Sequence, residues 1–522
     1  MFRFTAVHPL LYLSKLCFLI PILVSFELFA VENKHAVESP KLQKEKITQD
    51  IEHVLNRLKV VQGLSIAVYS TSGTYVAGFG VTDIETQENV TTDTAFYIAS
   101  STKSMLALLM SVKHANGKIN LDKSLKDFAP NAPFPKAIKA EQISLRDLLS
   151  MSSGIKHPAY VHRVAYSGEH DPELLWNLIG KTKPNQSKKI RLGHFRYTNW
   201  NYNLLARLVE QKTMQTWQQM LQNEIFNALS MTRTTAYISK AKKESWSIAR
   251  PHSTLGYDAP KRSYLEKTDK TMHSAGGVYM SAKDALTWLS VFINDGMADG
   301  NRLFEPQVIE ATREPLTLAN TSFGDYQRDH YGLGWYIGPY GNDNVKLVHH
   351  FGGFSGARAH VSYMPEKKMG VAVFVNDSQV GSKTIDAIAN YVYDTLLGDE
   401  SATVILVQRI DEIINWKDDL NARIASSREE ISRREWTLKR HIGEYKGTYM
   451  NEEWGTIQVE IENGLLRVTN GNLTALASAG TKSESIRVEL VPMNGTEVQF
   501  KSAWFGGIEG LEYEGIKFKL IK

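Results

Sequence analysis

The chain has 522 residues, 43% of them hydrophobic, which is enough to bury two or more cores. Lys and Arg number 60 and Asp and Glu 56, so the net charge is only +4, and no Lys/Arg-rich block with interleaved aromatic residues is present. Nucleic-acid binding is therefore not expected. Because the one cysteine, Cys17, lies in the N-terminal apolar run, a chain without that run has no disulfide, thiol nucleophile or cysteine-ligated metal site.

Residues 1–30 have the features of a secretory signal segment. Arg3 and Lys15 precede an apolar run that is short and interrupted by a proline, which makes it a weak candidate for a membrane span. Cleavage after Ala30 is predicted, with an uncleaved membrane anchor as the alternative. The polar, charged residues 31–50 are predicted to form a tether. The protein is accordingly expected to be exported, to the periplasm or outside the cell.

Residues 51–398 combine two strand-rich ends with a helical middle. Short strand patterns flank a Ser-Gly turn within residues 63–80, and a second strand-rich block covers residues 331–377. Between them, from about residue 100 to residue 315, helical periodicity and long loops dominate. This order predicts an α+β domain with an antiparallel sheet built from both ends of the segment and flanked by helices. A helical insertion should meet the sheet at a cleft.

The first candidate site residues lie in the stretch FYIASSTKSML, residues 96–106. Apolar residues from Met105 onward recur at helical spacing, and residues three apart share a helix face. Ser100 is therefore expected in the first helical turn beneath Lys103, whereas Ser101 points away. A lysine held neutral by burial can take the proton of a serine and make it a nucleophile. The alternative is a helix-capping serine followed by an exposed lysine.

Two later stretches carry polar residues and glycines beside predicted elements. FRYTNWNYNLL holds Tyr197 and Asn199 just before an amphipathic helix. VHHFGGFSG holds His350, Gly352 and Gly353 at the start of a strand. Helix capping is the alternative for the first pair, and an ordinary turn is the alternative for the glycines. A metal site at the two adjacent histidines is not expected, because no H-E-x-x-H motif or nearby acidic ligand accompanies them.

The last part of the chain changes in composition twice. Residues 399–440 are charged and helix-compatible and are predicted to form a solvated connecting helix. In residues 441–522 apolar and polar residues alternate around turns, which predicts a small all-β, barrel-like domain. Its predicted apolar face consists of Ile457, Val459, Ile461, Leu466 and Val468. We expect this domain to supply no catalytic residue, so a chain ending near Gly398 should keep its reaction with small probes.

The order S-x-x-K, Y-x-N and H-x-G resembles that of the penicillin-recognising serine hydrolases. These include class C β-lactamases, DD-peptidases, D-aminopeptidases and β-lactamase-like esterases. The resemblance covers residues 51–397 and implies a β-lactamase/transpeptidase-like fold. Residues 441–522 resemble the lipocalin-like domain that is attached to many such penicillin-binding-protein-like enzymes.

The resemblance implies a role for each motif residue. Ser100 attacks a carbonyl and forms an acyl-enzyme, with Lys103 and Tyr197 sharing the role of base in a way that the sequence leaves open. The backbone N–H groups of Ser100 and Gly353 form the oxyanion hole. The residues implied to bind substrate are Asn199, His350 and Gly352. No metal or cofactor is implied.

One departure from the pattern bears on the substrate. Most β-lactamases have a lysine where this chain has His350, and a histidine of ordinary pKa is mostly neutral at pH 7. The expected function is a serine hydrolase for short esters, D-residue peptides or β-lactam-like substrates, with esterase or peptidase action favoured over efficient β-lactam hydrolysis. An inactive β-lactamase-like binding or scaffold protein is the alternative. Expected partners are a small-molecule or peptide substrate and, as a further candidate, the cell wall.

Overall fold

The structure is a computed structural model that describes residues 42–59, 61–185, 191–257, 259–504 and 506–521. The predicted signal segment, residues 1–30, lies outside the described residues. The range 31–50 is described only from residue 42, and helix α1 (Lys44–Leu58) already begins within it. Of the helices in the described ranges, none has both the length and the apolar composition that crossing a membrane requires.

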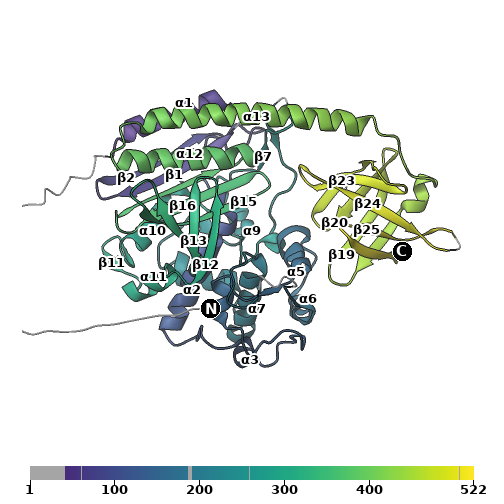
Figure 1. Ribbon diagram of the computed structural model, residues 1–522, viewed down its shortest axis with the longest axis horizontal. Helices are drawn as coiled ribbons and strands as arrows, with labels where there is room; N and C mark the ends of the chain where they lie inside the picture. The colour runs from purple at the N-terminus through teal and green to yellow at the C-terminus, as the bar shows by residue number, and fades with distance from the viewer. Residues whose placement is uncertain (1–41, 60, 186–190, 258, 505, 522) are drawn as a thin grey trace, which may run out of the picture. The chain divides into compact units, whose positions relative to one another are not determined.

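An eight-stranded antiparallel sheet forms the centre of the first domain, in the order β12-β13-β14-β15-β16-β17-β1-β2. Its strands are β1 (Gly63–Ser70), β2 (Gly73–Gly80), β12 (Thr317–Phe323), β13 (Tyr326–Tyr331), β14 (Tyr336–Tyr340), β15 (Val345–Phe354), β16 (Ala357–Met364) and β17 (Met369–Val375). Because β1 pairs with both β2 and β17, the two ends of the domain meet in one sheet, as predicted (Figure 1).

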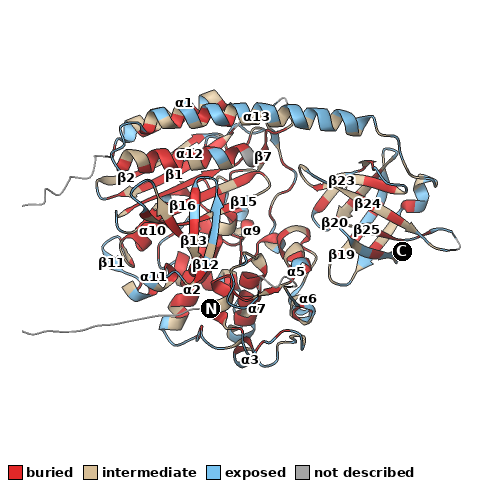
Figure 2. Cartoon of the chain, in the orientation of Figure 1, coloured by how far each residue is buried: buried red, intermediate tan, exposed pale blue. Residues whose placement is uncertain are grey.

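The sheet is covered by helices on both faces, which is why a central strand such as β17 is buried and free of polar side chains along its whole length. Along β1, Ile66 and Val68 face one core and Ala67 faces the other, as the two-residue period of a strand requires. Helices α1, α12 (Gln379–Leu396) and the start of α13 (Ala402–Ser432) pack in the first core, and the helical insertion packs in the second. Figure 2 shows the resulting band of buried residues across the strands.

The insertion is mostly helical, as predicted. Its helices are α2 (Thr102–Ala115), α3 (Leu125–Phe128), α4 (Leu145–Leu149), α5 (Pro158–His162), α6 (Pro172–Leu178), α7 (Asn199–Thr213), α8 (Trp217–Leu221), α9 (Ile238–Lys243), α10 (Ala282–Ile293) and α11 (Pro306–Thr312). Its short strands are β3 (Phe96–Tyr97), β4 (Ile155–Lys156), β5 (Lys183–Pro184), β6 (Thr234–Thr235), β7 (His252–Ser253), β8 (Lys261–Arg262), β9 (Tyr279–Met280), β10 (Met297–Ala298) and β11 (Asn301–Arg302). The strand β3, which pairs with β9, leads directly into the turn that carries Ser100.

Helix α13 differs from the solvated connecting helix predicted for residues 399–440. The side chains of Leu406, Ile410 and Ile413 are buried in the core that α13 shares with α1 and α12. Only the later part of the helix carries the exposed, charged surface that the sequence predicts. The first turns of α13 therefore belong to the first domain.

The C-terminal residues form a nine-stranded antiparallel sheet that is nearly closed into a barrel, in the order β21-β20-β19-β18-β26-β25-β24-β23-β22. Its strands are β18 (Gly447–Asn451), β19 (Gly455–Glu462), β20 (Leu465–Asn470), β21 (Leu473–Leu476), β22 (Ser478–Ala479), β23 (Ser485–Val491), β24 (Asn494–Ser502), β25 (Ile508–Tyr513) and β26 (Ile516–Leu520). The predicted apolar face is buried except at Ile461, which is 43% exposed. This residue lies at the end of β19, next to the turn at Asn463 and Gly464, where the barrel interior ends.

Candidate active site

Ser100 lies in a tight turn between β3 and α2. The turn is a short 3-10 segment, Ala99–Ser101, so Ser100 precedes the α-helix and does not lie in its first turn as expected. Ala99 has a φ of 44°, a left-handed conformation that costs a non-glycine residue on the order of 1–2 kcal/mol. A strained residue of this kind persists only where the surrounding structure holds it in place, and such residues are concentrated at functional sites.

Lys103 is fully buried one turn beyond Ser100. Its Nζ atom lies 2.8 Å from Asn199 Oδ1 and 2.7 Å from the carbonyl oxygen of Ala275, and it donates a hydrogen bond to each; Ser100 Oγ lies 3.1 Å away, where the lone pair of a neutral amine can accept from its hydroxyl. The side chain is 0% exposed, and burial lowers its pKa well below the ordinary lysine value. All three partners are neutral groups, so none of them offsets this loss of hydration. Lys103 is therefore poised to accept a proton from its serine neighbour.

The second serine has a different partner. Ser101 is buried, and its Oγ donates a hydrogen bond to the backbone carbonyl of His350 at 2.9 Å. That bond ties the turn to strand β15 and leaves the Ser101 hydroxyl outside the contacts of Lys103. Ser100, which is only partly buried, is the serine that both contacts the lysine and is accessible.

Tyr197 lies on the other side of the Ser100 hydroxyl. Its phenol forms a hydrogen bond with Ser100, and Lys103 Nζ lies 4.8 Å from the centre of its ring. The ring stacks on Tyr336 at a centroid distance of 6.2 Å. Burial raises the pKa of Tyr197 above the ordinary tyrosine value, so the phenol keeps its proton at neutral pH. Burial thus favours the neutral form of both the lysine and the tyrosine.

Asn199 is the first residue of α7, and its neighbour Thr198 caps that helix. The Thr198 hydroxyl accepts a hydrogen bond from Trp200 N at 3.2 Å, which leaves the Asn199 side chain available for the site. Because Asn199 Oδ1 accepts from Lys103, its amide NH₂ group is the end that can donate to another group.

His350 lies in the second half of β15 and not at the start of a strand as expected. Its Nδ1 donates to the carbonyl oxygen of Phe351 at 2.9 Å, so Nε2 has the lone pair, and this buried atom has no partner among the described residues. Burial lowers the pKa of His350 well below its ordinary value, and the nearby Lys103 and Arg328 lower it further. His350 is therefore a neutral hydrogen-bond acceptor and not a cation.

The two glycines after His350 differ in what surrounds them. A Cβ atom on Gly352 would lie 1.9 Å from the carbonyl oxygen of Ile98 and 3.2 Å from Ser100 N. Gly352 therefore lets β15 lie directly against the turn of the serine, and its implied role in binding substrate stays a prediction. A Cβ atom on Gly353 would first meet the side chain of Arg358, at 3.3 Å.

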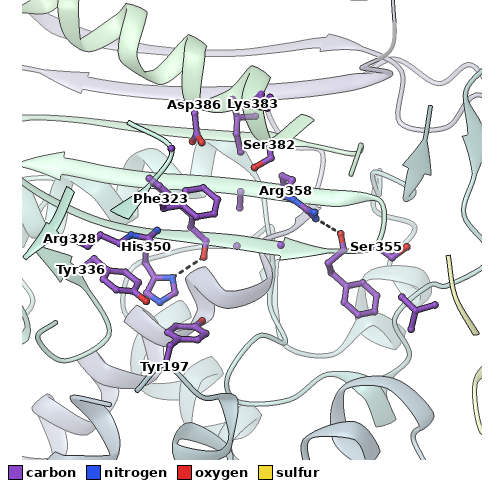
Figure 3. Close-up of a pocket in the computed structure, with 18 of the residues that line it drawn as sticks. Tyr197, Phe323, Arg328, Tyr336, His350, Ser355, Arg358, Ser382, Lys383 and Asp386 are labelled. Atoms are coloured by element: carbon purple, nitrogen blue, oxygen red, sulfur yellow. Dashed lines mark hydrogen bonds between the residues drawn. The ribbon is translucent and has the colours of Figure 1, made fainter. Parts of the chain in front are cut away.

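A cavity of about 850 Å³ opens beside this cluster (Figure 3). The residues that line it include Tyr197, Arg328, Tyr336, His350, Gly352 and Gly353. Its volume lies in the range of small-molecule sites. The second and third sequence motifs thus meet at one cavity, and the first motif adjoins it, because Ser100 contacts Tyr197 and the serine turn lies against Gly352.

Two of the lining residues were not identified from the sequence. Arg328 on β13 and Tyr336 on β14 reach the cavity from the two strands that precede β15 in the sheet order. Ala275, which accepts from Lys103, was likewise not identified. No spacing in the sequence links these residues to Ser100, because only the folded chain brings them to it.

Comparison with known proteins identifies the family. A family model described as beta-lactamase matches residues 50–392, well over half of the chain. The chain belongs to the beta-lactamase family. This membership confirms the predicted β-lactamase-like fold.

Relatives of this beta-lactamase family member are distant. Protein flp from Staphylococcus aureus is 21% identical over 341 residues, which are 64% of this chain and 63% of that protein. The octameric penicillin-binding protein homologue from Pyrococcus abyssi has a TM-score of 0.57 and 20% identity, covering 91% of this chain and 99% of its own. D-amino acid amidase from Ochrobactrum anthropi SV3 has a TM-score of 0.53 and 18% identity, covering 72% of this chain and 99% of its own. At these identities the two solved structures show a shared fold.

Proposed function

We propose that this protein is a serine hydrolase that cleaves ester or amide bonds through an acyl-enzyme on Ser100. The observation that carries the proposal is the contact of Lys103 Nζ with Ser100 Oγ at 3.1 Å, at a position where burial lowers the pKa of the lysine. A neutral amine within hydrogen-bond distance of a hydroxyl is the arrangement that nucleophilic catalysis by serine requires.

In the proposed acylation, Lys103 takes the Ser100 proton while Oγ forms a bond to the substrate carbonyl carbon. Lys103 is assigned the base role because its pKa is lowered, whereas that of Tyr197 is raised. The bond to the leaving group then breaks, and the leaving group takes a proton from the Tyr197 phenol, which the Lys103 proton replaces. In the second half of the reaction water attacks the acyl carbon and gives a proton to the same pair. The bond between the acyl carbon and Oγ then breaks, the pair returns a proton to Ser100 Oγ, and the acid product leaves.

The remaining motif residues are assigned to substrate binding. The backbone N–H groups of Ser100 and Gly353 are proposed to hold the carbonyl oxygen as it becomes negative. The Asn199 NH₂ group and the unpartnered His350 Nε2 are a donor and an acceptor that suit the two ends of a substrate amide.

Short esters and D-residue peptides are the proposed substrates. The similarity in fold to D-amino acid amidase supports the second class. Neutral His350 in place of a lysine argues against efficient β-lactam hydrolysis, since it supplies no cation for a β-lactam carboxylate. We further propose that the protein acts after export, a proposal that rests on the apolar segment within residues 1–30.

A fluorophosphonate probe tests the enzyme assignment. We expect the wild-type protein and the Ser101→Ala variant to be labelled, and Ser100→Ala not to be labelled, since only Ser100 contacts Lys103. Loss of the buried Ser101 hydrogen bond should cost about 1–3 kcal/mol of stability and leave the nucleophile in place. Labelling that maps to Ser101, or no labelling of folded wild-type protein, contradicts the proposal and favours a binding role.

Rates of turnover distinguish the substrate classes. We expect p-nitrophenyl acetate, p-nitrophenyl butyrate or a D-alanyl peptide to be turned over faster than nitrocefin. Faster hydrolysis of nitrocefin than of any ester or peptide would show that neutral His350 does not disfavour β-lactams.

A further inference from the structure

Lys103 is held by two acceptors that come from different parts of the fold. Asn199 Oδ1 belongs to the first residue of α7, and the carbonyl oxygen of Ala275 belongs to a turn of residues 273–276 before β9. Because Lys103 is fully buried, the directions of its N–H groups, and so of the lone pair toward Ser100, depend on where these two acceptors lie. Whatever fixes α7 against the 273–276 turn therefore orients the proposed base.

The side chain of Asn203 joins these two elements. It lies four residues after Asn199 on α7, which is about one helical turn along the same face, and it is 4% exposed. Its Oδ1 lies 3.2 Å from His273 Nδ1 and 3.1 Å from Ser274 Oγ. Both partners belong to the 273–276 turn, so Asn203 bonds that turn directly to the helix.

The turn is further fixed by backbone contacts. Gly276 N donates to the carbonyl oxygen of His273 at 2.9 Å, which closes the turn with Ala275 inside it. Ser274 Oγ also lies 3.1 Å from the carbonyl oxygen of Tyr202, so its one proton is shared between two acceptors on α7. With its first two residues bonded to α7 and its ends bonded to each other, the turn holds the Ala275 carbonyl in one place.

His273 is a neutral member of this network. Burial lowers its pKa well below the ordinary value, and the nearby Lys267 and Lys103 lower it further. A neutral imidazole has one N–H group, and donation from Nδ1 to Asn203 leaves the lone pair at Nε2. A Cβ atom on Gly276 would lie 3.2 Å from this Nε2, so the absence of a side chain there lets the ring pack against its own turn.

We propose that Asn203 is a positioning residue for the base Lys103. The inference rests on the proposed function: by holding α7 and the 273–276 turn at one spacing, Asn203 sets the two acceptors that direct Lys103 toward Ser100. The described residues that line the 850 Å³ cavity do not include Asn203. Its replacement should therefore slow the reaction and leave the binding of substrate nearly unchanged.

Turnover of p-nitrophenyl butyrate by two variants tests the proposal. Leucine is close to asparagine in size but accepts no hydrogen bond, so Asn203→Leu removes the contact without leaving a large cavity. We expect its kcat to fall about 10- to 100-fold with KM within a few-fold of wild type, because a misplacement of about 1 Å costs roughly 100-fold in rate. Asn203→Asp keeps an acceptor oxygen for Ser274 and should recover part of the lost kcat.

Asn201 is the matched control on the same helix. It is 0% exposed, and its Oδ1 accepts a hydrogen bond from Ser153 Oγ at 2.8 Å. Like Asn203, it has a side-chain NH₂ group without a partner among the described residues. Asn201→Leu and Asn203→Leu should therefore lower the Tm by similar amounts, whereas Asn201→Leu should keep kcat within a few-fold of wild type. Equal loss of kcat in both variants, or a change confined to KM, would overturn the proposal.

Ser274→Ala removes the other half of the contact and decides the question if Asn203→Leu does not fold. Its kcat should fall as well, and the Asn203→Leu/Ser274→Ala double variant should lose no more than the larger single loss, since both act through one contact. Wild-type kcat in a folded Asn203→Leu or Ser274→Ala variant, or additive losses, would overturn this inference alone. Absence of fluorophosphonate labelling at Ser100 in the wild-type protein would instead refute the proposed function and this inference with it.

Discussion

Gly352 determines how closely β15 approaches the serine turn, so replacing it by alanine should damage the site directly. The added Cβ would lie 1.9 Å from the carbonyl oxygen of Ile98, whereas real Cβ contacts are essentially never shorter than 3.0 Å. The strand and the turn must therefore separate by about 1 Å. Neither side yields easily, because the obstructing atom belongs to the backbone and the turn is bonded to the same strand through Ser101.

The expected size of the effect follows from that displacement. A misplacement of about 1 Å between reacting groups costs roughly 100-fold in rate, which is about 2.7 kcal/mol in the barrier. Overpacking of this kind also costs about 1–3 kcal/mol of stability. We expect Gly352→Ala to fold with a lower Tm and to acylate about 100-fold more slowly.

Gly353→Ala is the matched control. Its Cβ would first meet the Arg358 side chain, at 3.3 Å, and the substitution keeps the backbone N–H group assigned to the oxyanion hole. The rate of fluorophosphonate labelling and the Tm should therefore stay within a few-fold and a few degrees of wild type. Wild-type labelling by Gly352→Ala, or equal damage in both variants, would refute the argument that Gly352 positions Ser100.

Two further predictions concern the base and the connecting helix. The rate of probe labelling should rise with pH and then level off, because protonated Lys103 cannot take the Ser100 proton. The inflection of this profile should lie well below the ordinary lysine pKa of 10.5. A labelling rate that still rises through pH 10.5 would exclude Lys103 as the base. A chain that ends at Gly398 should fail to fold, because it lacks Leu406, Ile410 and Ile413, which are buried in the core. Burial of these three side chains contributes roughly 5–9 kcal/mol to the free energy of unfolding, which is about the whole stability of a typical domain. A chain that ends at Ser432 retains these residues, so its circular dichroism spectrum should show a folded protein, and the probe should label it at the wild-type rate. If the folded protein is not labelled, the site needs the C-terminal barrel.

The structure places Ser100 and Lys103 in contact, as their spacing of three residues suggested. That relation is local, because a helical or 3-10 turn brings such residues onto one face whatever the rest of the fold does. The sequence also predicted the strands at both ends of the first domain and those of the C-terminal barrel. Each of these predictions depends on the two-residue period of a half-buried strand.

Other features required the folded chain. The sequence of α13 is charged overall, and only its packing against α1 and α12 shows that Leu406, Ile410 and Ile413 belong to a core. Gly352 has a packing role that the motif did not predict, because the group that lies against it is the serine turn, about 250 residues earlier in the chain. Such long-range contacts leave no periodic signal in the sequence.

The sequence by itself determined the motif residues, the α+β class and the membership of a serine hydrolase family, because these depend on residue type and on spacing within single elements. The tertiary structure decided the electrostatics of the site. Burial, which depends on the whole surrounding fold, favours the neutral forms of Lys103, Tyr197 and His350. The order of strands in the sheet brings Arg328, with its positive charge, to the cavity that Tyr197 and His350 line.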